Sequence, residues 1–338
     1  MKHFDVFNGD ADGICALTQL RLAQPKDSIL ITGVKRDIQL LQSVTANEGD
    51  FLTVLDISME KNISGLVNAL DQGAEVFYAD HHRAGDVPAH YNLQALIDLD
   101  ANTCTALIID KYLNGEFHDW AICAAYGDNL IAKGDQLSAE AGYNQTQSEQ
   151  LKELGTLINY NGYGANVDDL HYHPAQLFQT LLKYPSPFDL LADSHSPFYV
   201  LQKAYQQDMD NALAQPSCYN SAKLAIFELP NRPWARRISG VYGNFLANNA
   251  PDRAHAVLTE NSNGSYNTAT GNKAQQAFVL MLVQIGVDIF GDQGFGLEGR
   301  ILSRSLIGHQ KYPCCFLSSI DADCPLSIAR PCRSDPVA

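Results

Sequence analysis

The chain is organised around one stretch near its start, Phe4-Asp-Val-Phe-Asn-Gly-Asp-Ala-Asp-Gly13. A short apolar strand here runs into a turn that carries Asp10 and Asp12, and a helix is expected from about Ile14. Two carboxylates this close repel each other, which costs folding energy unless a cation lies between them. The stretch therefore predicts a cation-binding turn at the end of a strand.

Three later segments have the same layout, each an apolar element that ends in residues able to bind a metal. They are Phe51-Leu-Thr-Val-Leu-Asp56, Glu75-Val-Phe-Tyr-Ala-Asp80-His81-His82 and the helix-like Ala121-Ile-Cys-Ala-Ala-Tyr-Gly-Asp128. A single Asp after a strand is more often a helix cap or turn residue, and Asp-His-His could be a hydrogen-bonded loop. Four such sites in succession favour a metal centre instead, because ligands bind at the carboxyl ends of strands in an open α/β sheet.

The order of elements predicts an α/β fold with a parallel sheet, since strands and helices alternate with short loops. The expected strands are 4–8, 28–34, 51–57, 75–79 and, at one edge, 95–99. The expected helices are 14–23, one opening at Asp37, 64–71, 103–113 and 119–133. Residues of about 136–215 are mostly helical in pattern, with breaks at 159–164 and 184–188, and we expect them to form a cap and linker.

A change in character near 216–220 predicts a domain boundary. The first domain would then span 1–215, and a smaller α/β domain would span 216–338. In the second domain we expect strands at 223–229 and 255–260 with a helix near 241–247 between them.

The bulk composition excludes several classes of protein. A length of 338 residues is enough for two domains with separate cores, and a net charge of −15 argues against a chain that coats nucleic acid. No apolar run reaches the roughly 18 residues of a membrane span, and the most apolar stretch, 277–283, is expected to be core. The start of the chain lacks the pattern of a secretory signal, so we expect a cytoplasmic protein.

The acidic residues at the ends of the predicted elements favour Mn²⁺ or Mg²⁺, because they offer hard oxygen ligands with one imidazole. Two such ions about 3.5–4 Å apart can grip a phosphate, and Asp56 is the natural candidate to bridge them. The expected ligands are Asp10, Asp12, Asp56, His81 and Asp128.

Other groups with metal-binding residue types are weaker candidates. His171 and His173 have a His-x-His spacing but no acidic or Cys partners in a recognised pattern. The late cysteines fit no zinc template, and the earlier ones lie in apolar helical contexts typical of buried thiols. The late group comprises Cys314, Cys315, Cys324 and Cys332; the earlier group comprises Cys15, Cys104 and Cys123.

These motifs resemble the four motifs of the DHH phosphoesterase superfamily, in the same order and over roughly residues 1–135. The matching residues are Gly9-Asp10-Ala11-Asp12-Gly13, Asp56, Asp80-His81-His82 and Gly127-Asp128-Asn129. The superfamily includes exonucleases of the RecJ kind, nanoRNases, cyclic dinucleotide phosphodiesterases and manganese pyrophosphatases.

The resemblance implies a role for each residue. Asp10 would bind one metal and Asp12 the other, Asp56 would bridge both, and His81 and Asp128 would complete the second site. His82 would face the scissile phosphate as a hydrogen-bond donor or acid. Asp80 would orient its neighbours, as carboxylates behind metal ligands commonly do.

One position departs from the pattern of many relatives. Where these carry a His or Asp before the first Asp of the motif, this chain has Asn8, whose neutral amide oxygen is a weaker ligand. The first site is therefore expected to load poorly, and the alternative is that Asn8 only forms the turn before Gly9. Lys35 and Arg36 follow the second strand and could contact a substrate phosphate, or could be a solvated pair at a helix start.

The second domain resembles only the beginning of a DHHA1 substrate domain. Residues 220–266 match in pattern, with Arg236 and Arg237 as candidate substrate ligands. Beyond Asn267 the expected loop Gly-Gly-Gly-His-x-x-Ala-Ala-Gly is absent, and the glycine-rich stretch 291–299 lacks its signature. We interpret the last seventy or so residues as diverged, through a reading-frame change in the gene.

The sequence thus predicts a phosphoesterase that uses two Mn²⁺ ions, or Mg²⁺, on a nucleotide or short single-stranded oligonucleotide. A homodimer and the absence of membrane contact are expected. The alternative is a catalytically impaired protein that binds nucleotides, supported by Asn8 and the missing loop. An acidic scaffold with a structural cation is disfavoured, because so many converging charges are costly without chemistry.

Overall fold

The computed structural model describes residues 1–260 and 266–269. Its first sheet has five parallel strands in the order β2-β1-β3-β4-β5. They are β1 (His3–Phe7), β2 (Ile29–Ile31), β3 (Phe51–Leu55), β4 (Glu75–Asp80) and β5 (Leu93–Ile97). The predicted α/β fold with a parallel sheet is confirmed.

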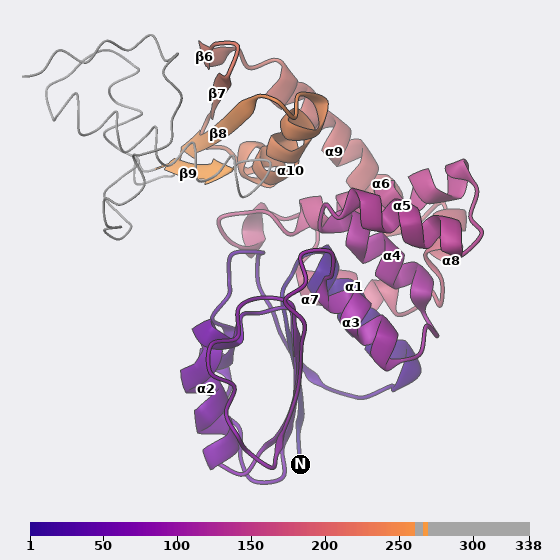
Figure 1. The fold of residues 1–338 in the computed structure, drawn as a ribbon, viewed down its shortest axis with the longest axis vertical. Helices are drawn as coiled ribbons and strands as arrows, with labels where there is room; N and C mark the ends of the chain where they lie inside the picture. Colours follow the sequence, from indigo (N-terminus) through magenta and orange to yellow (C-terminus); the bar gives the residue numbers. More distant parts are fainter. Residues whose placement is uncertain (261–265, 270–338) are drawn as a thin grey trace, which may run out of the picture.

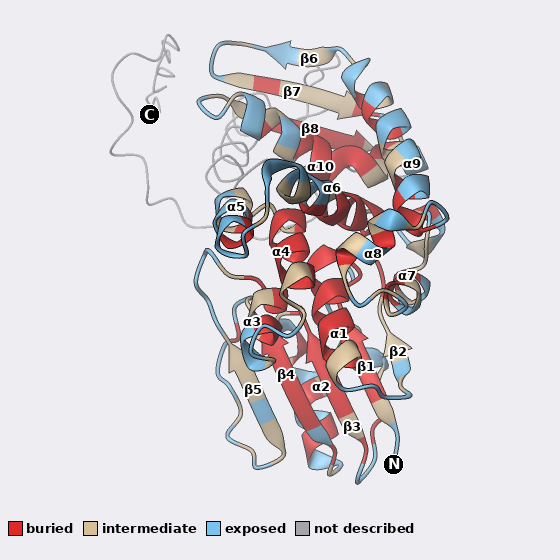
Figure 2. Ribbon diagram, turned by 90° about the vertical axis from the view of Figure 1, so that its right-hand side faces the viewer, coloured by how far each residue is buried: buried red, intermediate tan, exposed pale blue. Residues whose placement is uncertain are grey.

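The three central strands are almost entirely buried, whereas the edge strands β2 and β5 are partly exposed (Figure 2). Continuous apolar runs such as those of β1 and β3 suit this position, because strands in a parallel sheet are covered on both faces. The helix α2 (Met59–Asp71) covers one face, and α1 (Ala11–Ala23) and α3 (Thr105–Tyr112) lie on the other (Figure 1).

The two covering layers differ in sequence pattern. In α2 the buried residues recur every three or four positions, from Met59 to Leu66 and Leu70, which leaves a solvated face. In α1 every residue from Ala11 to Arg21 is buried, because this helix lies between the sheet and a further layer of helices.

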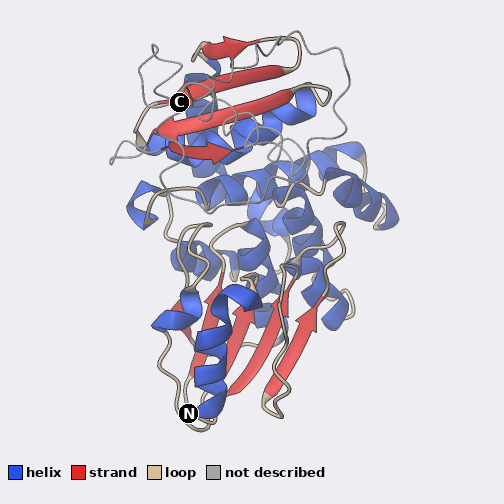
Figure 3. Ribbon diagram, turned by 60° about the vertical axis from the view of Figure 1, so that its left-hand side comes forward, coloured by secondary structure: helices blue, strands red, loops and turns tan. Residues whose placement is uncertain are grey.

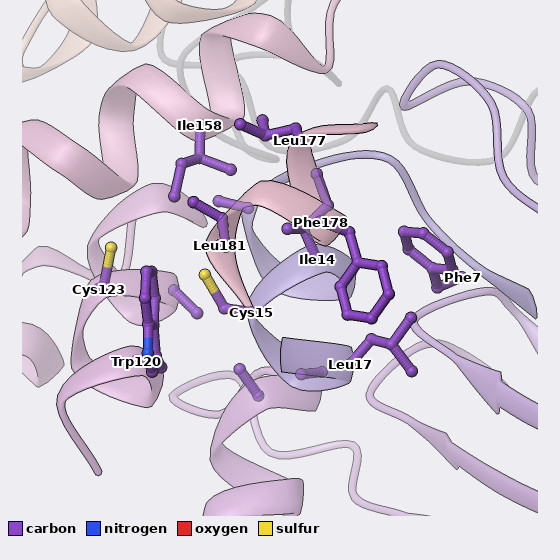
Figure 4. Packing of buried hydrophobic residues seen from close by; sticks show 14 of the residues in the cluster. Phe7, Ile14, Cys15, Leu17, Trp120, Cys123, Ile158, Leu177, Phe178 and Leu181 are labelled. Carbon is purple, nitrogen blue, oxygen red and sulfur yellow. The ribbon is translucent and has the colours of Figure 1, made fainter. Parts of the chain in front are cut away.

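That further layer packs on α1 through a continuous apolar core, in which side chains of β1, α1, α4, α6 and α7 meet (Figure 4). Close approach of α4 and α6 requires glycine at Gly155, where a Cβ would lie 2.0 Å from the carbonyl oxygen of Cys123. The helices of this layer are α4 (His118–Gly127), α5 (Ile131–Glu140), α6 (Gln145–Asn161), α7 (Pro174–Leu181), α8 (Pro187–Ala192) and α9 (Pro197–Leu213).

A second, mixed sheet follows α9, at the opposite end of the molecule from the first sheet (Figure 3). Its order is β6-β7-β8-β9, with β7 and β8 parallel and joined by α10, so the smaller C-terminal α/β unit is also confirmed. The elements are β6 (Ser217–Asn220), β7 (Leu224–Leu229), α10 (Pro233–Asn249), β8 (Ala254–Glu260) and β9 (Tyr266–Ala269).

Two predicted helices were wrong. Asp37 does not open an α-helix, because its Oδ2 accepts a hydrogen bond from Val34 N (3.0 Å) in a tight turn, and only a 3₁₀ turn at Leu40–Ser43 follows. The helix expected over 119–133 is two helices, α4 and α5. They are separated at Asp128, and the next residue, Asn129, has a left-handed backbone (φ 62°).

Several sequence-based predictions lie outside the described residues. They concern the apolar stretch 277–283, the glycine-rich stretch 291–299, the four late cysteines and the diverged tail. Among the described helices, none combines the length and apolar character needed to cross a bilayer.

Candidate metal centre

The acidic turn after β1 places Asp10 at the start of α1. Its side chain caps the helix, with Oδ1 accepting hydrogen bonds from the backbone N–H groups of Asp12 and Gly13 (both 3.1 Å). Its Oδ2 lies 2.6 Å from Lys35 Nζ. Burial by itself raises the pKa of Asp10, but Lys35 and the hydrogen bond from Gly13 outweigh it and hold this pKa at about 2.

Asp12 is fixed by the N-terminus of α3. Its Oδ2 accepts a hydrogen bond from Thr105 N and its Oδ1 accepts one from Ala106 N, both at 2.7 Å. Free backbone N–H groups at a helix start favour a negative charge, so this contact stabilises a buried carboxylate. Each oxygen keeps a second lone pair with which to bind a cation.

Asp56 follows β3 in a left-handed backbone conformation, with φ 59°. This conformation is uncommon for residues other than glycine, though Asn and Asp tolerate it best, and such strain clusters at functional sites. Thr105 Oγ1 donates a hydrogen bond to Asp56 Oδ1 (3.1 Å). Burial, followed by the charges of Asp12 and Asp10, raises the pKa of Asp56 well above its usual range.

His81 points its Nε2 atom at three carboxylates. Nε2 lies 3.5 Å from Asp56 Oδ1, 3.7 Å from Asp12 Oδ2 and 3.9 Å from Asp128 Oδ2. The other ring nitrogen, Nδ1, lies 3.1 Å from the carbonyl oxygen of Thr103, to which it can only donate. Nδ1 therefore carries a proton, so Nε2 is the ring atom that can bind a cation.

Asp128 enters the centre from the C-terminal end of α4. The helix ends at Gly127, where a Cβ would lie 2.4 Å from that of Ala11, so α4 approaches α1 closely here. Burial raises the pKa of Asp128 to about 6, with Lys35 lowering it and Asp12 raising it further. The surroundings of Asp128 in the cluster thus destabilise its ionised form relative to its protonated form.

Asp80 and His82 form a pair beside these residues. Asp80 is fully buried at the end of β4, and its Oδ1 lies 2.7 Å from Nδ1 of the half-exposed His82. Burial lowers the pKa of His82, but the hydrogen bond with Asp80 and the charges of the nearby carboxylates outweigh burial and raise it.

Solved structures of similar architecture include PggH of Vibrio cholerae, described as a pGpG-specific phosphodiesterase. It is 13% identical, with a TM-score of 0.50 and with 84% of this chain and 88% of PggH covered. The manganese-bound exonuclease RecJ has a TM-score of 0.46 at 17% identity, with 76% of each chain covered. CDC45 of Entamoeba histolytica has a TM-score of 0.42 at 12% identity, with 85% of this chain and 88% of CDC45 covered.

The chain shares its fold with PggH. No protein-family model and no curated protein sequence matches this chain. At 13% identity the likeness to PggH shows the fold alone, so the chemistry of this chain has to come from its own residues.

The donor set fits a divalent metal ion on the His81 side of the centre. Among the described residues, two groups bring ligand atoms within 4.8 Å of one another: Asp12, His81 and Asp128, and Asp56, His81 and His82. Carboxylate oxygens with one or two imidazole nitrogens suit Mn²⁺, and Mg²⁺ where oxygen dominates. Asp10, expected as a ligand, belongs to neither group.

Lys35 reaches the centre from the loop after β2 and occupies the Asp10 side. Its Nζ lies 3.7 Å from Asp128 Oδ1 and 3.2 Å from Asn159 Oδ1, besides its contact with Asp10. Burial lowers the pKa of Lys35, but Asp10 and Tyr163 outweigh burial and raise it well above its usual range, so it carries a positive charge.

A pocket of about 340 Å³ opens over the centre. The basic side chains of Lys61, on α2, and Arg83, directly after His82, line it, and neither was among the residues expected at the site. The pocket is lined by Asn8, Asp10, Lys35, Ile38, Asp56, Ile57, Ser58, Glu60, Lys61, His81, His82, Arg83 and Asp128.

The other basic residues expected to bind substrate lie elsewhere. Arg36 is exposed and does not line the pocket. Arg236 pairs with both carboxylate oxygens of Asp169 (2.7 Å each), and Arg237 pairs with Asp208 (2.9 Å). These pairs join α10 to the helical layer, and substrate binding by either arginine stays a prediction.

The His-x-His pair belongs to neither group of candidate ligands in the described part of the chain. His171 Nε2 lies 2.9 Å from the hydroxyl of Tyr160, and His173 caps α7 through Ala175 N. Sequence reasoning also missed Thr103 and Thr105, which hold His81 and Asp56. In the sequence, only their position at the start of the helix expected over 103–113 indicated such a role.

Proposed function

We propose that this chain is a metal-dependent phosphoesterase that hydrolyses a phosphoester bond in a nucleotide or short single-stranded oligonucleotide. The observation that carries the proposal is the position of His81 Nε2, which lies 3.5–3.9 Å from the carboxylates of Asp12, Asp56 and Asp128. Such a constellation costs folding energy without a cation, which is typical of a catalytic metal site.

Asp12, Asp56, His81 and Asp128 would hold the ion, with Mn²⁺ as the proposed metal and Mg²⁺ as the substitute. When bound, the ion supplies a Lewis acid for the phosphoryl oxygen and lowers the pKa of water. The hydrogen bonds from Thr103, Thr105 and α3 keep the ligands in place before substrate arrives, as supporting contacts do at metal sites.

His82 is the proposed proton donor to the leaving oxygen. Its side chain is 46% exposed and lines the pocket, while Asp80 holds Nδ1 and leaves Nε2 for the substrate. A raised pKa increases the fraction of protonated imidazole near neutral pH, which a general acid requires.

The pocket favours a small substrate. Its volume of about 340 Å³ suits a nucleotide or the end of a short strand, and Lys61 and Arg83 at its rim suit phosphate oxygens. The description of PggH as a pGpG-specific phosphodiesterase makes a linear dinucleotide one substrate worth testing. A DHHA1-like second domain, a homodimer and a cytoplasmic location remain parts of the proposal.

Product release from a small substrate panel tests the proposal, with Mn²⁺ present or chelated. The panel holds phosphoadenosine phosphate, a linear dinucleotide, a cyclic dinucleotide, pyrophosphate and a short single strand. Asp56→Asn is the informative variant, because Asn tolerates the left-handed backbone and removes only the charge. Asp71→Asn, exposed at the far end of α2, is the matched control.

We expect turnover that needs Mn²⁺, is lost in Asp56→Asn and is kept in Asp71→Asn. Absence of turnover on every substrate, with metal bound and the fold intact, would contradict the proposal. It would favour the second candidate, a nucleotide-binding protein without turnover, which the Lys35–Asp10 pair supports by blocking one expected metal position. Such a protein would retain nucleotide in equilibrium dialysis and release no product.

A further inference from the structure

We infer that the centre binds one divalent ion per chain, and that the Lys35 ammonium supplies the second positive charge, beside Asp10. This inference deepens the proposed function and rests on it, since it concerns the same site. It differs from the expectation of two ions, because the residues on the Asp10 side do not fit a second one.

The ammonium of Lys35 is surrounded as a bound cation would be. Two oxygens lie within hydrogen-bond distance of Nζ, those of Asp10 (2.6 Å) and Asn159 (3.2 Å), and the carboxylate of Asp128 lies 3.7 Å away. Nζ also lies 5.6 Å from the centre of the Tyr163 ring, within the range of a cation–π contact.

The backbone holds Lys35 in this place. Its N–H donates to the carbonyl oxygen of Gly162 (2.8 Å), and its carbonyl oxygen accepts from Asn8 Nδ2 (3.4 Å). Tyr163 is supported in turn by α10, because a Cβ at Gly240 would lie only 2.2 Å from its ring. The loop after β2 is thus tied both to the first strand and to the end of α6.

On the Asp10 side, both carboxylate oxygens of Asp10 already have partners. Asp10 Oδ1 accepts two backbone hydrogen bonds and Oδ2 pairs with Lys35. Asn8 is neutral, and its Oδ1, which has no hydrogen-bond partner among the described residues, offers one uncharged oxygen. A divalent ion here would have to displace the ammonium against direct charge repulsion.

The ligands on the other side suffice for one ion only. Both candidate groups contain His81, and its Nδ1 is engaged with Thr103 O, so Nε2 is its one free ligand atom. One nitrogen lone pair binds one ion, so the two groups are not complete at the same time. They overlap at a single ion position beside His81 Nε2, and the proposed role of His82 as proton donor favours Asp12, Asp56 and Asp128 as its other ligands.

The arrangement leaves two unlike positive charges facing the pocket. Lys35 lines it from one side, and the ion would lie on the His81 side. A lysine ammonium binds phosphate as a point charge, so Lys35 would neutralise a phosphate oxygen that a second ion would otherwise hold. Lys35 is thereby assigned a role in substrate binding. This role can be tested without measuring turnover.

Metal stoichiometry tests the inference directly on the full chain. Equilibrium dialysis against saturating Mn²⁺, with native mass spectrometry, should give one ion per chain, and the electron paramagnetic resonance spectrum should be that of isolated Mn²⁺. Two ions per chain with an exchange-coupled spectrum would overturn the inference while leaving the proposed function intact. Binding of no ion would contradict the proposed function itself.

A double variant tests the part played by Lys35. Asn8→His with Lys35→Met restores a ligand and removes the ammonium at nearly constant volume, and it should bind two ions with a coupled spectrum. Arg36→Met, the neighbouring exposed position, is the matched control and should bind one. A folded double variant that still binds one ion would overturn the assignment of Lys35, and the wild-type stoichiometry stands as a test without any variant.

Discussion

The two sides of the acidic cluster differ in what neutralises their charge. On one side Asp10 has a lysine ammonium 2.6 Å away and a pKa of about 2. On the other, Asp12, Asp56 and Asp128 lie around the His81 imidazole, and the pKa values of Asp56 and Asp128 are raised. The difference teaches that only the His81 side stores the electrostatic strain that a bound ion would relieve.

The largest expected effect is the loss of Mn²⁺ affinity when His81 is replaced. His81→Ala should lower Mn²⁺ affinity by more than about 100-fold, because loss of a group that merely supports a ligand already costs about 10- to 100-fold. Asp10→Asn, which keeps the helix cap, should cost far less. Isothermal titration calorimetry on both variants checks this, and equal losses would mean that the two sides do not differ.

The pH dependence of the metal-free protein should reveal the strain. The pKa of Asp128 is about 6 in the folded chain against an ordinary value of 3.8, so the folded form holds this proton more tightly than the unfolded chain does. The resulting stabilisation is complete below pH 3.8 and is lost as the pH rises through 6. It amounts to about 3 kcal/mol at 1.36 kcal/mol per pKa unit.

Denaturant unfolding between pH 4 and 7, with metal chelated, measures this loss. Asp128→Asn should flatten it. Asp10 has the opposite sign, because its pKa of about 2 gives stability that is present above pH 3.8 and lost as the pH falls towards 2. We expect the free energy of unfolding of the wild type to fall over this range. A rise between pH 4 and 6 would count against the raised pKa of Asp128.

Removing the ammonium should make the Asp10 side resemble the other. Lys35→Met leaves Asp10 buried and unpaired, and we expect a loss of about 2 kcal/mol in metal-free stability, below the 3–5 kcal/mol of a fully buried pair because Lys35 is part-exposed. Chemical denaturation measures it, with Arg36→Met as the control. Unchanged stability would show that the pair contributes nothing.

The smallest expected effect concerns a supporting contact. Thr105→Val removes the hydroxyl that donates to Asp56 Oδ1 and should lower Mn²⁺ affinity by about 10-fold, the low end for such contacts. Thr156→Val, which loses only a hydrogen bond to the carbonyl of Lys152, is the matched control. A fall in affinity no larger than that of the control would remove Thr105 from the site.

The features that depend on local sequence pattern were predicted correctly. Apolar runs such as those ending at Asp56 and Asp80 predicted the buried strands and the edge at which the acidic residues meet. The helix predicted to open at Asp37 is absent, because the Asp37 side chain accepts a hydrogen bond from Val34 N in a turn. Asp caps turns as well as helices, so the residue type alone does not distinguish the two. The break at Asp128 was likewise hidden in a continuous helical pattern.

The partners within the site could not be read from the sequence. Lys35 contacts Asn159, 124 positions away, and Asp12 is held by amides 93 and 94 positions further on. Such pairs depend on how the loop after β2 and the start of α3 pack against α1 and α6. The pattern showed candidate ligands, and the fold decides which of them a cation reaches.

Anomalous diffraction from a crystal of the full chain grown with Mn²⁺ tests the central claim most directly. We expect one manganese peak per chain within coordination distance of His81 Nε2, with Lys35 Nζ still beside Asp10 Oδ2. Two peaks, or one peak beside Asp10 with Lys35 displaced, would contradict it.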